Sequence, residues 1–268
     1  MLNAKGITWG WFSGGFSNCK QTHTTSNGGV RADYVPHHEP FQYYKSTSNP
    51  NHLPPSSVAM IGHQGDQANH QYDITNFWQA AESHNLPAVS FIKAPAYQDG
   101  NPGYSNPLLE QQFIVSFINQ FETLPEWSRT AIFILWDDSG GWYDHVMSPL
   151  LNQSQSARDA LTGPGTCGAN AAKVAGGYEG RCGYGTRLPF LVISPWAKQN
   201  YVDHRVTDQT SVIHFVEDNW NTGRIGDYSY DAWSGSVEGM FDFDDRRHAR
   251  PLLLDPTTGQ VVNNGWDH

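Results

Sequence analysis

Two adjacent aspartates, Asp137 and Asp138, follow an apolar run in the stretch FILWDDSGGWYDHV at residues 133–146. Neighbouring carboxylates repel each other unless a cation or a base neutralises them. A divalent metal ion with oxygen ligands does this well, and the glycines at 140–141 let the backbone turn close to a ligand. The stretch therefore predicts a metal site at a strand end, with a turn of solvated aspartates as the alternative.

Histidines at two places have the chemistry to join such a site. His145 follows in the same stretch, where it is either a metal ligand or an acid, or simply a partner of Asp144. His37 and His38 are adjacent in VPHHEPFQYY. Neighbouring imidazoles can donate to a phosphate or bind a metal ion. A solvated loop pair explains His37 and His38 equally well, so both interpretations stay open.

Short apolar runs predict the buried strands that must position these residues. Each run is rich in β-branched or aromatic residues and is bounded by turn residues. Because the runs lack polar alternation, they favour a parallel sheet covered on both faces. They are AVSFI (88–92), AIFILW (131–136), PFLVIS (189–194) and, near the start of the chain, ITWGWF.

Helical periodicity lies between and after these runs, and the alternation of strands and helices predicts an α/β sandwich. The helices are expected at 74–84, 106–124 and 208–220, with Asp73 or Thr75, Asn106 and Asp208 near their starts. In open α/β sheets, ligands bind at the carboxyl ends of the strands, where Asp137 and Asp138 fall. We expect a single domain over 1–268 with long loops at 17–72 and 150–187, and a hairpin in DPTTGQVVNNG near the end.

Composition excludes several classes of protein. The net charge of −10 argues against a nucleic-acid partner, and no window approaches the eighteen apolar residues of a membrane span. The three cysteines are Cys19, Cys167 and Cys182, and a disulfide between the last two or three unpaired thiols are both compatible with the sequence. There is no phosphate-binding loop of the nucleotide hydrolases and no Gly-x-Ser-x-Gly elbow.

Four motifs, TAIFILWDDSGGWYDHV, LPAVSFIKAP, YGTRLPFLVISPWAK and SVIHFVEDNW, together resemble the bacterial phosphoesterase family. That family includes phospholipases C and secreted acid phosphatases, and the similarity runs from about residue 2 to about residue 245. The resemblance implies an alkaline-phosphatase-like, three-layer α/β sandwich with a mainly parallel central sheet. It also implies hydrolysis of phosphate esters, first of all cleavage of phospholipid headgroups, with an acid-phosphatase-type phosphomonoesterase as the alternative.

The resemblance also implies roles for individual residues. Asp137 and Asp138 correspond to the family's ligands for one divalent metal ion, and His37 and His38 to its phosphoryl-binding pair. His145, which closes the Gly-Gly motif, is the remaining candidate for a catalytic role. The implied partner is a phospholipid or a small phosphate ester, and the implied location is extracytoplasmic or secreted, although no signal peptide is present in this sequence. A peripheral membrane contact is left open.

Two departures from the family pattern bear on the mechanism. The family usually has a histidine where QDGNPGYS carries Asn101. The resemblance implies that Asn101 lines the phosphate site with His37 and His38, where an amide can donate a hydrogen bond but not a proton. The family's other metal ligands and its hydroxyl nucleophile lie upstream of the segment that resembles LNAKGITWGWF, so we expect an N-terminally incomplete catalytic domain. An inactive relative that acts as a binding protein, with 10 Trp and 12 Tyr for stacking, is the alternative from another class.

Overall fold

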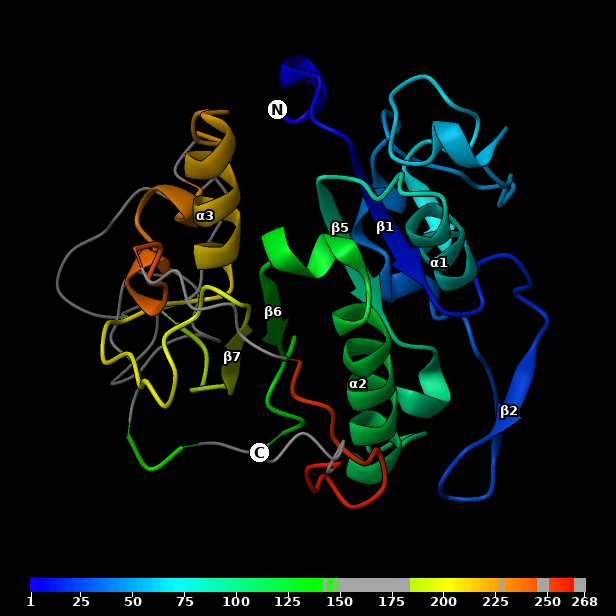
Figure 1. Cartoon of the computed structure of the whole chain (residues 1–268). Coiled ribbons are helices and arrows are strands. Elements are labelled where there is room, and N and C mark those ends of the chain that lie inside the picture. Colours follow the sequence, from blue (N-terminus) through cyan, green and yellow to red (C-terminus); the bar gives the residue numbers. More distant parts are fainter. Residues whose placement is uncertain (142–143, 147, 149–183, 227–228, 245–250, 263–268) are drawn as a thin grey trace, which may run out of the picture. The chain divides into compact units, whose positions relative to one another are not determined.

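The computed structural model describes residues 1–141, 144–146, 148, 184–226, 229–244 and 251–262 (Figure 1). The chain forms two compact units. The sheet unit consists of residues 2–129 and 248–268, and the inserted unit consists of Met1 with Thr130–Arg247. The sheet unit is therefore discontinuous in sequence, because the inserted unit interrupts it.

A three-stranded parallel sheet is the centre of the sheet unit. Strand β1 (Trp9–Ser13) lies between β4 (Gln71–Asp73) and β5 (Val89–Lys93). Both neighbours run parallel to β1, with Trp11 opposite Gln71 on one side and Phe91 on the other. The strands predicted from ITWGWF and AVSFI are thus confirmed, together with their parallel pairing.

The two helices of the sheet unit begin at local capping signals. In α1 (Ile74–Glu82), the Asp73 carboxylate accepts a 3.0 Å hydrogen bond from the Thr75 amide, so Asp73 is the cap. In α2 (Pro107–Glu122), the Asn106 side chain accepts from the Leu109 amide at 3.0 Å, and Pro107 occupies the first position. Both helices start where the sequence predicts.

Aromatic rings fill the core between the sheet and these helices. The ring of Phe12 lies 5.1 Å from that of Tyr72 and 5.4 Å from that of Phe77, and all three side chains are buried. Gly10 faces this cluster, since a Cβ atom there would lie 2.8 Å from the Tyr72 ring. Strand β1 thereby sits close enough to its neighbours for tight packing.

The segment 17–72, expected to be a long loop, contains regular structure. Strands β2 (Thr22–Thr24) and β3 (Val30–Ala32) form an antiparallel hairpin. A chain of short turns then leads to β4. The 3₁₀ helices described in both units lie at Asn3–Lys5, Pro36–His38, Pro40–Tyr43, Val58–Met60, Ala96–Gln98, Pro125–Arg129, Tyr230–Ala232 and Glu238–Met240.

The inserted unit contains β6 (Ile132–Leu135), β7 (Phe190–Ile193) and α3 (Thr210–Trp220). The predicted strands and helix exist, but the expectation of one parallel sheet is wrong here, because β6 and β7 pair antiparallel. The strands are also less buried than expected, since Leu135 and Leu191 are 41% and 49% exposed, and an apolar run does not fix the direction of the neighbouring strand. The Phe133 ring lies 5.2 Å from that of Phe215, which joins β6 to α3.

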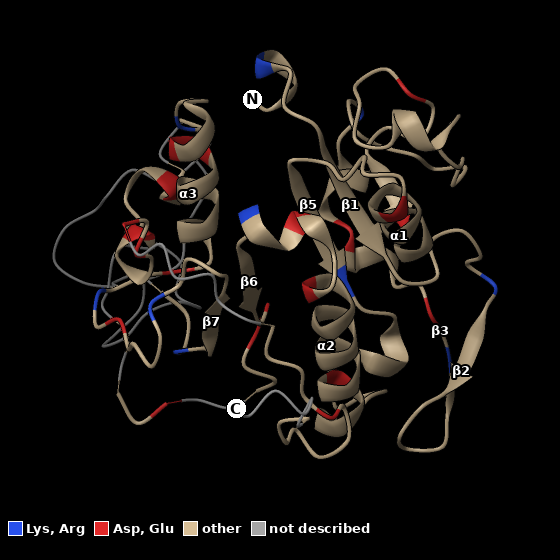
Figure 2. Cartoon of the chain, in the orientation of Figure 1, with Lys and Arg blue, Asp and Glu red and all other residues tan. Residues whose placement is uncertain are grey.

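Most of the predicted loop at 150–187, together with Cys167 and Cys182, lies outside the described residues. Cys19 is an exposed free thiol. Within the described ranges, no helix is long and apolar enough to cross a bilayer. Lysine and arginine are scattered over several segments of both units (Figure 2).

The C-terminal segment 251–262 belongs to the sheet unit and lies against α2. Asn119 exchanges two hydrogen bonds with the Leu254 backbone, at 2.7 and 3.1 Å. Leu254 forms a bridge with Val261, so the hairpin expected near the end of the chain is present.

Candidate functional site

Two loops meet at the carboxyl edge of the parallel sheet. The Gly14 amide, just after β1, donates to the carbonyl of Lys93 at the end of β5. A Cβ atom at Gly14 would lie 2.5 Å from Pro95, and one at Gly15 would lie 2.7 Å from Asp33. Glycine is therefore required here for the loop after β1 to approach the loop after β5. Ligands of open α/β sheets bind at this edge.

His38 is held between two residues of the loop that follows β5. Its Nδ1 lies 3.6 Å from a carboxylate oxygen of Asp99, and its Nε2 lies 3.4 Å from the hydroxyl of Tyr104. The side chains of His38 and Asp99 are 10% and 1% exposed. The imidazole is thus fixed by partners on both sides. His37 is exposed, and its ring lies 4.5 Å from that of His38 in an edge-on arrangement.

Asn101 shapes the turn that carries these partners. Its amide donates to the Asp99 carboxylate at 3.0 Å, and its side-chain oxygen accepts from the Gly103 amide at 2.8 Å. The side-chain oxygen is therefore used within the loop, which leaves the NH₂ group to donate elsewhere. The sequence predicts that His37, His38 and Asn101 belong to one site. In the structure, Asp99 contacts both His38 and the Asn101 amide, and His37 lies beside His38.

A second histidine–aspartate pair, not singled out from the sequence, lies beside the first. His23 on β2 places Nδ1 2.6 Å from the Asp33 carboxylate, and its ring stacks on Tyr97 at 4.0 Å. The Asp33 carbonyl accepts from the Ala96 amide at 2.9 Å, which fixes the two segments together. The pairing arises across a hairpin, so only a correct register for residues 22–32 reveals it.

Glu39, next to His38, is a fully buried carboxyl group. Its Oε1 accepts from the Phe41 amide at 3.0 Å, while Oε2 has no hydrogen-bond partner among the described residues. Burial raises the pKa of Glu39 to about 8. The group is therefore protonated at neutral pH and adds no negative charge beside the histidines.

Asp137 and Asp138 lie in the inserted unit, directly after β6, and both are exposed. The side-chain amide of Gln209, at the start of α3, donates to the carbonyls of Trp136 and Asp137 at 2.7 and 3.0 Å. The Gly140 amide donates to the Asp138 carboxylate. The exit of the strand is therefore fixed in a turn that presents two carboxylates.

The donor chemistry of this turn fits a hard divalent cation, since carboxylate oxygens are its preferred ligands. The described residues supply only part of a coordination shell, because among them no three His, Cys, Asp or Glu side chains converge on one point. Within the described ranges, the turn therefore offers two carboxylates but not a complete set of metal ligands.

His145 is exposed and does not share the environment of a buried ligand. Its neighbour Asp144 pairs with Arg187 at 2.8 Å and accepts from the Val146 amide at 3.1 Å. The hydrogen bond from Val146, and then Arg187, lower the pKa of the Asp144 carboxyl. Asp144 is therefore engaged in an ion pair with Arg187.

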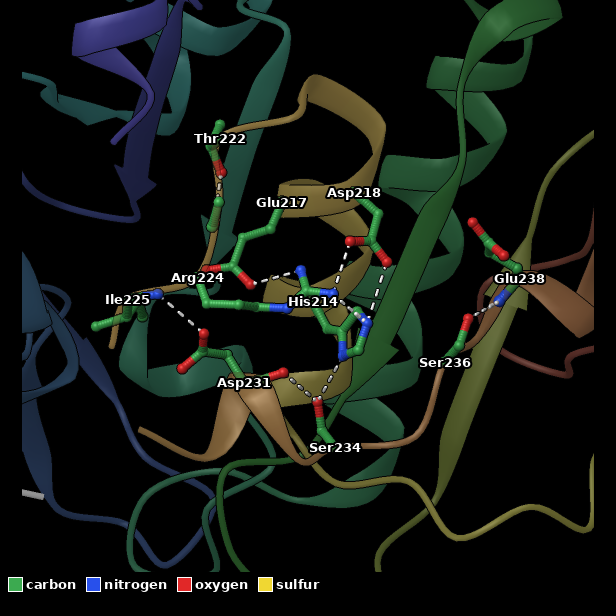
Figure 3. Close-up of polar contacts among 11 residues, drawn as sticks. His214, Glu217, Asp218, Thr222, Arg224, Ile225, Asp231, Ser234, Ser236 and Glu238 are labelled. Carbon is green, nitrogen blue, oxygen red and sulfur yellow. Dashed lines mark hydrogen bonds and ion pairs between the residues drawn. The ribbon is translucent and has the colours of Figure 1, made fainter. Parts of the chain in front are cut away.

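A polar network on α3 was also missed by sequence reasoning (Figure 3). Arg224 donates to Glu217 at 3.1 Å and to Asp218 at 2.7 Å, and it lies 2.6 Å from Nε2 of His214. Figure 2 shows the acidic positions of α3 in red. Burial, and then Asp231, raise the pKa of Glu217. The network joins α3 to the segment that follows it.

Comparison with known proteins identifies the family of the chain. The sequence model of the Phosphoesterase family matches residues 1–223. Similar curated proteins include a non-hemolytic phospholipase C of Pseudomonas aeruginosa, 34% identical over 50% of this chain and 20% of that protein. Another is a non-hemolytic phospholipase C of Burkholderia pseudomallei, 33% identical over 53% of this chain and 20% of that protein.

A hemolytic phospholipase C of Pseudomonas aeruginosa is 28% identical over 60% of this chain and 22% of its own length. The matches thus span about a fifth of the length of these curated relatives. The family match covers most of the chain, from the first strand to the end of α3. The chain belongs to the Phosphoesterase family.

Proposed function

We propose that this chain serves the hydrolysis of phosphodiesters, most specifically the cleavage of phospholipid headgroups as in a phospholipase C. The observation that carries the proposal is the His38 imidazole, fixed between Asp99 and Tyr104 at the carboxyl edge of a parallel sheet. An imidazole held in one orientation is suited to bind a phosphoryl oxygen. The names of the three bacterial relatives support the same reaction class.

In this proposal, His37, His38 and the side-chain NH₂ of Asn101 bind the phosphoryl oxygens of the substrate. Asp99, 3.6 Å from Nδ1, orients the His38 imidazole. Glu39 stays neutral in its buried position and so does not oppose anion binding. His145 is proposed as a further polar group near the carboxylate turn.

Asp137 and Asp138 are proposed as two oxygen ligands of a divalent metal ion. Such an ion, when bound, neutralises phosphoryl charge and makes a hydroxyl nucleophile more acidic. Gln209 keeps the strand exit in place and so orients the Asp137 backbone. The Gly140 amide donates a hydrogen bond to the Asp138 carboxylate and so restricts its orientation.

The finer features of the architecture are proposals as well. The parallel sheet with α1 and α2 is compatible with an alkaline-phosphatase-like, three-layer sandwich. The whole chain is proposed to be a single phosphoesterase domain. By its resemblance to bacterial phospholipases C, we propose that the protein acts outside the cytoplasm.

Contact with a lipid surface is supported by an exposed aromatic pair that follows the histidines. Tyr43 and Tyr44 are 68% and 62% exposed, whereas the Phe41 ring contacts that of Trp9 at 4.7 Å. Tyr43 and Tyr44 are therefore exposed to solvent, while the nearby Phe41 packs against the core. Tyrosine at an exposed rigid site suits the interface between water and lipid headgroups.

The proposal is tested on the full-length protein with two phosphodiesters of phosphocholine, one carrying p-nitrophenol and one carrying a short-chain diacylglycerol. We expect hydrolysis of both, loss of activity in chelator, and loss of both activity and bound metal in Asp137→Ala and Asp138→Ala. Asp244→Ala, an exposed aspartate of the same unit, is the matched control and keeps both properties. Unchanged activity and metal content in both site variants contradict the proposal.

An acid-phosphatase-type phosphomonoesterase is the second candidate, favoured by the exposed position of His37, which suits a small ligand. A phosphomonoester such as p-nitrophenyl phosphate separates the two candidates. Faster hydrolysis of this monoester than of the phosphocholine diesters favours the second one.

A further inference from the structure

Two histidine–aspartate pairs lie in neighbouring segments of the sheet unit. His38 pairs with Asp99, and His23 pairs with Asp33. Asp33 lies five residues before His38, and its carbonyl binds the amide of Ala96, in the loop that carries Asp99. The function proposed above uses the first pair and leaves the second without a role.

The His23 ring is fixed on one side and open on the other. The Asp33 carboxylate is buried and accepts from Nδ1 at 2.6 Å, so the proton of a neutral ring resides on Nδ1. The ring stacks on Tyr97 at 4.0 Å, yet 40% of the side chain is exposed. Nε2 is therefore the nitrogen that remains for proton exchange, in the arrangement by which a carboxylate orients a catalytic imidazole.

The hairpin that carries His23 is fastened to the loop of the first pair. The side-chain amide of Asn27 donates to the Gly103 carbonyl at 2.9 Å, and Arg31, opposite His23 in the hairpin, lies over the Tyr104 ring at 5.6 Å. Tyr104 in turn contacts His38. His23 is thus held on the structure that positions His38.

The groups packed against the His23 ring are an anion, a cation engaged elsewhere and a neutral phenol. Asp33 is the adjacent anion, and Arg31 is engaged with Tyr104. Burial, and then Asp33, raise the pKa of the Tyr97 hydroxyl, so this neighbour stays neutral. An imidazole that a carboxylate holds in one orientation is suited to general acid catalysis.

Cleavage of an alkyl phosphodiester requires such a donor, because an alkoxide is a poor leaving group. The amide of Asn101 has no proton to give. Resting on the function proposed above, we propose that His23 is the general acid that protonates the leaving alcohol, with Asp33 as its positioning residue.

The attacking oxygen, supplied overall by water, forms a new bond to phosphorus, and the bond from phosphorus to the leaving oxygen breaks. The electron pair of that bond passes to the leaving oxygen, which takes the proton from Nε2 of His23. The neutral ring regains a proton from the water consumed, and the products are a phosphomonoester and an alcohol.

The leaving group tests this role. The full-length protein and its His23→Gln variant are compared on p-nitrophenyl phosphocholine, whose phenolate departs unprotonated, and on short-chain phosphatidylcholine, whose alkoxide needs a proton. We expect the variant to lose about 10²- to 10⁴-fold in kcat on phosphatidylcholine and less than about tenfold on the nitrophenyl ester. The alkaline limb that His23 adds to the wild-type pH profile of kcat on phosphatidylcholine should be absent in His23→Gln.

His63→Gln replaces an exposed histidine of the same unit and is the matched control, with both activities retained. Asp33→Asn keeps an acceptor for Nδ1 and provides a second variant, expected to show the same substrate difference, should His23→Gln not fold. Equal losses on both substrates, or no loss on phosphatidylcholine, overturn the role of His23 while the proposed function stands. A wild-type protein that cleaves neither ester overturns the proposed function and this role together.

Discussion

The side-chain amide of Gln209 lies 3.0 Å from the carbonyl oxygen of Asp137, and it donates a second hydrogen bond to Trp136. The start of α3 is thereby tied to the residues that leave β6. Because a metal site depends on groups that orient its ligands, this contact links the position of a helix to the proposed binding of a cation.

Replacement of Gln209 by Ala should weaken metal binding without removing a ligand. We expect about a 10- to 100-fold lower affinity for the divalent ion that supports activity, by the usual effect of a lost orienting contact. Isothermal titration calorimetry measures it. Gln64→Ala, at an exposed glutamine, is the control, and an unaltered affinity in Gln209→Ala shows that the contact does not orient the site.

Replacement of Asp99 by Asn should impair phosphate binding through His38. The variant keeps the shape of the side chain but removes the anion that lies 3.6 Å from the imidazole, so His38 loses the partner that orients it. We expect weaker inhibition by inorganic phosphate and a loss of activity. A phosphate affinity equal to that of the wild type at every pH contradicts this role.

Glu39 makes the stability of the sheet unit depend on pH. Its pKa is about 8 in the folded protein, against an ordinary value of 4.5, so the folded state holds a proton that the unfolded state loses. This contribution is fully present below about pH 4.5 and disappears as the pH rises through about 8. The total is a few kcal/mol, since each pKa unit corresponds to about 1.4 kcal/mol.

Glu39→Gln should remove that dependence, because glutamine still accepts from the Phe41 amide and never ionises. We expect wild type and variant to be similar in urea unfolding at pH 5, and the variant to be more stable by a few kcal/mol at pH 9. A constant difference between the two proteins across this range shows that Glu39 is ionised in the fold.

Arg224 should stabilise the inserted unit through its two carboxylate partners. Arg224→Met leaves the buried Glu217 without its cation, and we expect a loss of about 1–2 kcal/mol, reduced from the buried-pair range because Arg224 is 32% exposed. The loss should shrink at low pH, where Glu217 protonates. Arg205→Met, which breaks a surface pair with Asp203, is the control and costs less than about 1 kcal/mol.

Features that depend on neighbours in sequence were predicted well. Asp73 and Asn106 cap their helices because a side-chain oxygen reaches an amide two or three residues ahead, and that geometry needs nothing else. The strand at 88–92 was recognisable for the same reason, as a short apolar run between turns.

Features that depend on distant partners were not predictable from one sequence. The antiparallel pairing of β6 with β7 joins residues more than fifty positions apart, and the His23–Asp33 pair requires the register of a hairpin that looked like an irregular loop. The residues proposed from the resemblance, such as His38, carried a motif, but their partners Asp99 and Tyr104 became visible only in three dimensions.

The contact between Asn119 and Leu254 has a consequence for synthesis of the protein. The sheet unit receives its last segment only after the whole inserted unit has left the ribosome, because residues 251–262 complete the surface of α2. Nascent chains that stop within the inserted unit should therefore expose the side of α2 that this segment covers. Residues 251–262 therefore join the sheet unit late in cotranslational folding, and their loss should lower the yield of soluble protein more than their small core contribution suggests.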